Sequence, residues 1–310
     1  EVSTETLQPG LHVMRATGGA VIVSIGEDGV LMIDDQYPQT ARRIQDEIQT
    51  LGGGDVDLVV NTHAHFDHAD GNPLLGAAGA SIVAHANARR QMLRSSRLDY
   101  AGFHYIQPAY PAEGLPALTF DEAITLHFNA HTIDVQYFGR GHTDGDVAVF
   151  FREANIVHVG DLFSGGYPYI DANNGGSLAG LIAVSRAILD KTDAETRIVS
   201  GHAPVADREA LAAYAEMLEI CRKRPMPASR SCFSAMRRKV SRRVQRSSWK
   251  CSCTSRTLTQ SFQRSRSSYS GSRMLATCCR RGSSGSSARP ASTVSSAAPR
   301  GRGNSALSDP

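Results

Sequence analysis

The stretch NTHAHFDHADGN, residues 61–72, follows directly after the apolar run VDLVV, residues 56–60. It places three histidines and two aspartates within eight positions. A short apolar run of this kind predicts a buried β-strand, so the ionisable side chains are expected at the end of that strand.

Four of these side chains can converge on one point. His63 and His65 are two positions apart, so they project to the same side of an extended segment, and Asp67 and His68 follow where the chain is expected to turn. Neutral imidazole and carboxylate are ligands that zinc prefers in proteins. Burying such a cluster without a cation would be costly, so the pattern indicates a metal site.

Three later segments supply further ligands of the same kinds. His142 lies in GRGHTDGD, Asp161 in VHVGDLF and His202 in IVSGHAP, each close to glycine, which lets backbone and ligand approach a crowded centre. The full pattern, H-x-H-x-D-H followed by H, D and H, resembles the metallo-β-lactamase superfamily. The resemblance runs from about residue 10 to about residue 220.

This resemblance implies an α/β fold, a four-layer αβ/βα sandwich, with a dinuclear metal site between its two sheets. Two zinc ions per chain are expected. Asp34, in LMIDD, resembles an aspartate that members of this superfamily carry at the end of an early strand, where it contacts the metal ligands and not the metal. The metal ligands carried over are His63, His65 and His142 for the first ion, Asp67, His68 and His202 for the second, and Asp161 as the bridge.

The implied function is hydrolysis of a small-molecule carbonyl substrate, a lactone, thioester or β-lactam, by a metal-bound hydroxide. Asp67 is the candidate catalytic residue, which would accept or pass on a proton. Zinc β-lactamases of the superfamily usually carry Cys or Ser where this chain has Asp161, which argues against a β-lactam as native substrate. Two alternatives stay open: an enzyme similar to mononuclear iron persulfide dioxygenases, and a non-catalytic metal-binding module.

Apolar patterns predict the elements around these ligands. A hairpin is expected over residues 18–34, and a helix over residues 41–51 with Ile44, Ile48 and Leu51 on one face. Further strands are expected within residues 124–139, 146–161 and 196–202. Helices are expected over residues 177–190, capped by Ser177, and over residues 208–220.

The distributions of charged residues and of cysteines differ between two parts of the chain. Residues 222–310 hold 20 of the 33 Lys and Arg but one of the 30 acidic residues, so their formal charge is about +19, against about −16 for residues 1–221. No cysteine precedes Cys221, so no disulfide or cysteine metal site belongs to the first part. We predict a hydrolase domain over 1–221 and a disordered basic Ser/Arg-rich tail over 222–310. This tail is either a basic arm that binds nucleic acid or anionic lipid or, as we favour, the product of a shifted reading frame.

The acidic first part is expected to repel nucleic acid, and no apolar run is long enough to cross a bilayer. We therefore expect a small-molecule substrate and no nucleic-acid or membrane partner for the folded domain, and the oligomeric state stays open. The chain starts at Glu1, as removal of an export signal would leave it, so a periplasmic or secreted location and a cytoplasmic one are both considered.

The segment LFSGGYPYIDANNGGS, residues 162–177, follows Asp161 and carries three aromatic residues. Phe163, Tyr167 and Tyr169 either wall the substrate site or serve ordinary packing. Histidines that match no family ligand are interpreted as structural or exposed: His85, His104, His127, His131 and His158.

Overall fold

Two β-sheets lie at the centre of the part that the computed structural model describes, residues 1–100 and 103–223. The strands of the first sheet, in spatial order, are β1 (Ser3–Gln8), β2 (Leu11–Ala16), β3 (Gly19–Gly26), β4 (Gly29–Ile33), β5 (Leu58–Val60), β6 (Ser81–His85) and β9 (Leu118–Phe120). Strands β1 to β4 form an antiparallel meander. Strands β5, β6 and β9 continue the sheet in parallel from β4.

The second sheet is formed by the later part of the chain. Its strands, in spatial order, are β10 (Ala123–Phe128), β11 (His131–Tyr137), β12 (Val147–Phe151), β13 (Ile156–His158) and β14 (Arg197–Val199). The first four are antiparallel, and β14 pairs in parallel with β13. The strands predicted within residues 124–139, 146–161 and 196–202 are thereby confirmed, as is the predicted hairpin over residues 18–34, which is β3 and β4 of the first sheet.

Alternating side chains fill the space between the two sheets. Ile22 of β3 belongs to the same buried cluster as Val149 and Phe151 of β12, whereas Val21 and Val23 face the other side of the first sheet. This is the period of two that a strand with both faces covered requires. Burying each of these large apolar side chains contributes about 1.5–3 kcal/mol relative to leaving it exposed.

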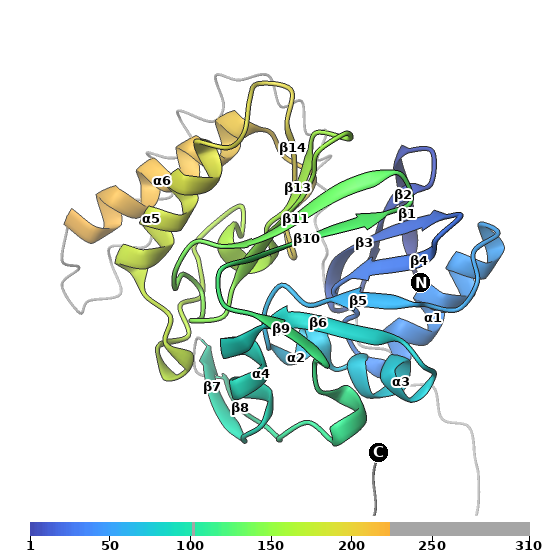
Figure 1. Ribbon diagram of the computed structural model, residues 1–310. Helices are drawn as coiled ribbons and strands as arrows, with labels where there is room; N and C mark the ends of the chain where they lie inside the picture. Colours follow the sequence, from blue (N-terminus) through green and yellow to red (C-terminus); the bar gives the residue numbers. More distant parts are fainter. Residues whose placement is uncertain (101–102, 224–310) are drawn as a thin grey trace, which may run out of the picture. The chain divides into compact units, whose positions relative to one another are not determined.

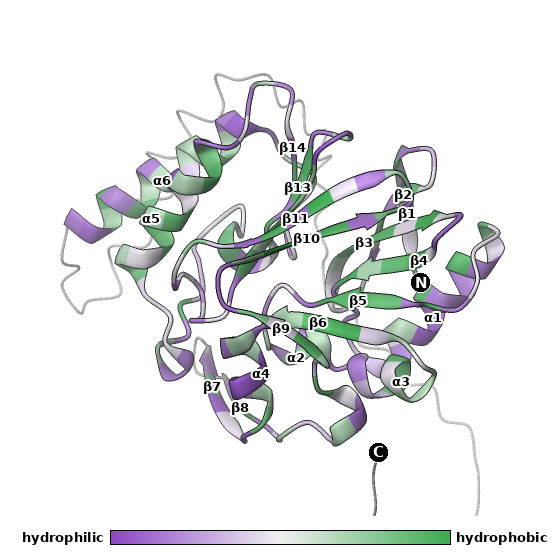
Figure 2. Ribbon diagram, in the orientation of Figure 1, coloured by the Kyte–Doolittle hydropathy of each residue, from purple (hydrophilic) through white to green (hydrophobic). Residues whose placement is uncertain are grey.

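Helices cover the outer face of each sheet (Figure 1). Helix α1 (Pro38–Thr50) packs Ile44 and Ile48 against the outer side of the first sheet. Helices α5 (Leu178–Leu189) and α6 (Arg208–Lys223) cover the second sheet, and the hydroxyl oxygen of Ser177 accepts a hydrogen bond from the Gly180 N–H at the start of α5. Apolar residues concentrate on the strands, while α1 and α6 also carry polar residues along their length (Figure 2). The predicted four-layer αβ/βα sandwich is confirmed.

The expected helix over residues 41–51 was wrong at both ends. Helix α1 begins at Pro38, because proline suits the first turn of a helix. Leu51 follows the last turn as the C-cap and is 40% exposed, so it does not belong to the buried face. The sequence patterns also missed β1, β2, β6 and β9, which complete the first sheet.

Several short elements connect the strands and longer helices. A separate hairpin is formed by β7 (Ser96–Tyr100) and β8 (Phe103–Gln107). The short helices are α2 (Phe66–Ala69), α3 (Asn72–Ala77) and α4 (Ala86–Met92), and the 3-10 turns are η1 (Ala112–Gly114), η2 (Gly160–Leu162) and η3 (Ala172–Asn174).

The predicted tail over 222–310 lies outside the described residues, except that Arg222 and Lys223 still belong to α6. Its disorder and its origin therefore stay predictions. None of the helices described up to Lys223 combines the length and apolarity that crossing a bilayer requires.

Candidate metal centre

The H-x-H-x-D-H motif begins immediately after β5 and runs into α2. The backbone of the connecting segment is fixed between both sheets, because Asn61 N donates to Val83 O of β6 and Val147 N of β12 donates to Thr62 O. The chain bends at Thr62, His63 and Ala64, His65 is extended just before α2, and Asp67 and His68 lie in α2. The predicted turn at Asp67 and His68 is confirmed, whereas the extended segment predicted to carry both His63 and His65 was wrong at His63.

Three histidines from two segments form the first group of possible ligands. One ligand atom each of His63, His65 and His142 lies within 4.8 Å of the others. Nε2 of His142 is 2.8 Å from Nδ1 of His65, and the ring of His63 lies 4.7 Å from both other rings, centroid to centroid. All three side chains are buried.

A second group of possible ligands lies beside the first. It consists of Asp67, His68 and His202, whose ligand atoms also lie within 4.8 Å of one another. His202 Nε2 is 3.2 Å from Asp67 Oδ2 and 3.3 Å from His68 Nε2. His68 is buried, whereas the His202 side chain is 39% exposed, so this group is the one that faces solvent.

The carboxylate of Asp161 lies between the two groups. Its Oδ1 is 3.2 Å from His68 Nε2 and 3.4 Å from His202 Nε2, and its Oδ2 is 3.6 Å from His142 Nε2. The structure therefore brings together all seven residues that the sequence singled out as metal ligands.

The residues fit a metal ion because one buried nitrogen lacks any other partner. The Thr62 hydroxyl donates to Asp34 Oδ2 at 2.8 Å, which leaves its oxygen to accept from Nδ1 of His63 at 3.1 Å. Nε2 of His63 then carries the lone pair, and it is buried without a hydrogen-bond partner among the described residues. Such a buried acceptor is unfavourable unless it binds a cation.

Charge within the cluster also favours a cation. Burial alone would lower the pKa of His68, but the negative charges of Asp161, Asp34 and Asp67 outweigh it and raise that pKa well above its usual value. Hydrogen bonds with Asp161 and Asp67 raise the pKa of His202 to about 9. The carboxylates therefore stabilise positive charge at this point. A metal ion would supply that charge in place of the protons on His68 and His202.

Asp34 supports the centre from behind, as the sequence suggested. It follows β4 in a left-handed backbone conformation, with φ of 61°. Its Oδ2 accepts a hydrogen bond from Nδ1 of His68 at 2.8 Å, and its Oδ1 accepts from Thr62 N at 2.7 Å. One buried carboxylate thus orients His68 directly and His63 through Thr62.

A second supporting carboxylate, Asp171, was not predicted. It is buried, and its Oδ2 lies 2.8 Å from Nε2 of His65. The stretch DANNGG does indicate a turn that begins at Asp171, but no local signal identifies a contact with a histidine 106 positions away.

The aromatic residues after Asp161 have different surroundings. Phe163 is buried in the core against Tyr214, which supports the packing alternative for this residue. Tyr167 is 45% exposed. Tyr169 lies beside the first group, with its ring 5.9 Å from that of His65 and 5.6 Å from that of His142.

The remaining histidines are structural or exposed, as expected. Two are buried with local partners: His85 caps α4 and stacks on Tyr137, and His158 accepts a hydrogen bond from Gly160 N. His104 and His127 are exposed, and Nε2 of His131 is 3.2 Å from Nε2 of Gln8.

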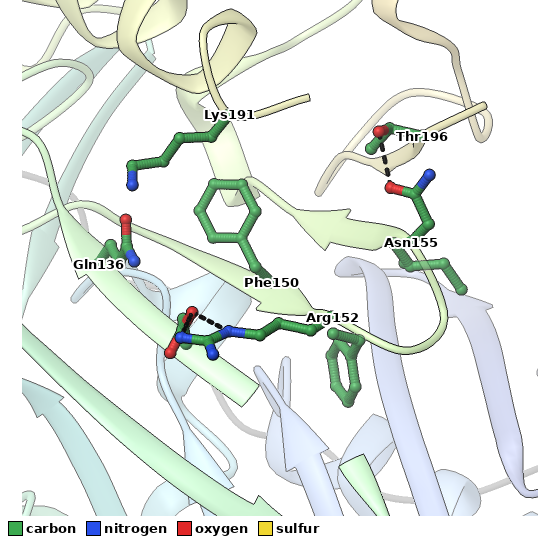
Figure 3. A pocket seen from close by; sticks show the side chains of 9 residues that line it. Gln136, Phe150, Arg152, Asn155, Lys191 and Thr196 are labelled. Atoms are coloured by element: carbon green, nitrogen blue, oxygen red, sulfur yellow. Dashed lines mark hydrogen bonds and ion pairs between the residues drawn. The ribbon is translucent and has the colours of Figure 1, made fainter. Parts of the chain in front are cut away.

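A pocket of about 320 Å³ lies apart from the metal centre (Figure 3). It lies where β12 ends and where β13 and β14 begin, whereas Asp161 and His202 follow the ends of β13 and β14. Arg152 and Lys191 line it, and Arg152 is paired with Asp134. None of the seven candidate ligands contributes to this pocket.

A protein-family model and several solved structures match this chain. The family model described as the metallo-beta-lactamase superfamily matches residues 16–202. A metallo-β-lactamase from Pontibacter korlensis is similar in structure, with a TM-score of 0.59 and 16% identity over 71% of this chain and 99% of that chain. DIM-1 metallo-β-lactamase (TM-score 0.57, 18% identity) and TMB-1 (TM-score 0.56, 19% identity) each match over 71% of this chain and 98% of theirs. At these identities the structural likeness shows a shared fold.

Proposed function

This chain belongs to the metallo-β-lactamase superfamily, and on that basis we propose that it is a dinuclear zinc hydrolase acting on a small-molecule carbonyl substrate. The observation that carries the proposal is the buried, unpartnered Nε2 of His63 at the meeting point of seven ligand-type side chains. Most buried polar atoms in proteins have a hydrogen-bond partner, and what distinguishes this unpartnered nitrogen from others in the described chain is its place among six further ligand-type side chains.

The two groups and the carboxylate between them divide the metal-binding roles. His63, His65 and His142 would hold one zinc ion, and Asp67, His68 and His202 the other, with Asp161 bridging both. Two bound zinc ions supply hydroxide at neutral pH, by lowering the pKa of water, and polarise a carbonyl oxygen.

The chain itself contributes orientation and proton transfer. Asp34 fixes the ring of His68 and, through Thr62, that of His63. Asp67 is less enclosed, with a side chain that is 21% exposed. Burial would raise its pKa, but the charge of His68 and the hydrogen bond from His202 lower it overall. With zinc bound, the metal ions would replace the protons of His68 and His202 as the positive charge beside this carboxylate, and Asp67, on the side of the centre that faces solvent, could accept a proton and deliver it to the leaving group.

Metal content is the direct test of this proposal. We expect purified protein to contain close to two zinc equivalents. Asp161→Ala should reduce this to about one, because the variant loses the oxygen near His68 and His202 while the three-histidine group stays complete. Elemental analysis of both proteins measures the difference. One tightly bound iron, together with oxygen consumption, would overturn the hydrolase in favour of a dioxygenase-like enzyme.

Substrate preference is expected to follow carbonyl reactivity and charge. Lactones and thioesters react readily with hydroxide, as β-lactams do, but penicillins and carbapenems also carry a carboxylate. A β-lactam carboxylate would be stabilised by a Lys or Arg close to the metal centre. Among the described residues, however, every ion pair of the seven candidate ligands joins a histidine to an aspartate, and none involves Lys or Arg. We expect the best lactone or thioester to exceed every β-lactam by at least about tenfold in kcat/KM. A β-lactam that outperforms every ester, lactone and thioester would contradict this ranking.

A further inference from the structure

Residues 169–174, here called the ligand strap, contact two of the three histidines in the first group. Nε2 of His65 donates to Asp171 Oδ2 at 2.8 Å, and Nδ1 of His142 donates to the carbonyl oxygen of Tyr169 at 2.9 Å. Because a carboxylate and a carbonyl oxygen only accept, these contacts set the tautomer of both rings. The other nitrogens, Nδ1 of His65 and Nε2 of His142, then carry the lone pairs and face the metal centre.

The ligand strap is held in shape by its own hydrogen bonds. Asp171 Oδ1 accepts from the backbone N–H groups of Asn173 at 3.1 Å and Asn174 at 3.2 Å, while its backbone N–H donates to His142 O at 2.9 Å. The Asp171 side chain has no exposed surface. Gly176 allows the next turn to pass closely, since a Cβ there would lie 2.2 Å from His142 O.

The opposite side of the ligand strap is anchored to the β7–β8 hairpin and to the end of α4. Asp99 N of β7 donates to the Tyr169 hydroxyl at 3.2 Å, and Asn173 Nδ2 donates to Arg97 O of the same strand at 3.0 Å. Arg94, just after α4, donates to Asn174 Oδ1 at 3.3 Å. The ligand strap therefore connects the outer hairpin with two metal-facing rings.

Among the described residues, the hydrogen bonds of the ligand strap do not extend to the second group. His68 is oriented by Asp34, and the exposed His202 follows β14 on the other side of the centre. We propose that the ligand strap, with Asp171 as its positioning residue, controls how firmly the three-histidine group retains its metal, and that the β7–β8 hairpin holds the strap in place. This inference rests on the metal binding of the proposed function but not on hydrolysis.

The test is the rate at which zinc leaves the loaded protein. Zinc-loaded full-length protein is mixed with the chromophoric chelator 4-(2-pyridylazo)resorcinol, and release is followed by absorbance. We expect two phases, and His202→Ala, which removes a ligand of the second group only, identifies the phase that belongs to the three histidines. Asp171→Ala should accelerate that phase by at least about tenfold and leave the other phase within about twofold of wild type.

Two further variants separate positioning from general stability. Asp171→Asn keeps an acceptor oxygen for His65 and should restore most of the slow release. Asn173→Ala, which removes the bond to the hairpin, should accelerate the same phase about threefold. Asn155→Ala is the matched control, because it removes side-chain bonds to Asp193 and Thr196 elsewhere and should lower the melting temperature without altering either phase.

The outcomes distinguish this inference from the proposed function. Equal acceleration of both phases by Asp171→Ala, or no acceleration of either, would overturn the role of the ligand strap while leaving a dinuclear hydrolase intact. Wild-type protein that takes up no zinc would overturn both.

Discussion

Replacing Gly201 by alanine is expected to lower kcat/KM on the order of 100-fold, although the change removes no ligand. A Cβ at this position would lie 2.6 Å from Asp161 Oδ1 and 2.6 Å from Cε1 of His68, closer than side-chain atoms pack. Neither neighbour can yield easily, because His68 is held by Asp34 and Asp161 lies among three histidines. The added methyl group must therefore displace Asp161 or His68, two of the candidate metal ligands.

Gly54→Ala is the matched control for this prediction. Its Cβ would meet no atom within 4 Å, and neither glycine has the positive φ that alanine resists. The two variants are compared in kcat/KM, zinc content and melting temperature. Gly201→Ala should lose metal as well as activity, while Gly54→Ala should match wild type in both. Full metal content and activity in Gly201→Ala would show that the seven residues do not form the working centre.

The fold was predictable where its elements carry a periodic pattern of their own. The apolar runs of β3 and β12 and the helical spacing of Ile44 and Ile48 are local signals, and each corresponds to covered faces in the structure. Strands β6 and β9 were missed, and their place in the sheet depends on pairing with β5 and with each other, which no local pattern records. Leu51 shows the same limit, because its spacing suits the buried face but the helix ends before it.

The same difference between local sequence signals and long-range contacts applies to the candidate site. The seven candidate ligands were recognisable because histidine and aspartate cluster after an apolar run and recur in later motifs, and their assignment to two metal ions came from the family resemblance. Asp171 was not, because its importance lies in one contact with His65, made by a loop from a distant part of the chain. Histidine content alone would have misled, since His85 and His158 are as buried as His63, His65 and His68 yet have local hydrogen-bond partners.

A substitution at Asp67 is expected to have the largest effect on the chemical step. Asp67→Asn keeps an oxygen near His202 but removes the charge that accepts a proton. We expect kcat to fall about 1,000-fold for whichever lactone or thioester is hydrolysed, and by a similar factor for any β-lactam activity, since both need the same proton transfer. KM should change much less, because the substitution affects the transition state more than substrate binding.

Asp70→Asn provides the matched control, one turn further along the chain. Asp70 accepts a hydrogen bond from the Tyr110 hydroxyl at 2.7 Å, and an asparagine oxygen can accept it as well. Both variants are assayed in excess zinc with their metal content measured, so that weaker metal binding is not mistaken for slower chemistry. If Asp67→Asn with two bound zinc ions kept kcat within about tenfold of wild type, proton transfer would have to be assigned to another group. If it lost the zinc beside His68 and His202 even in excess metal, Asp67 would be a ligand first, and its catalytic role would follow from that.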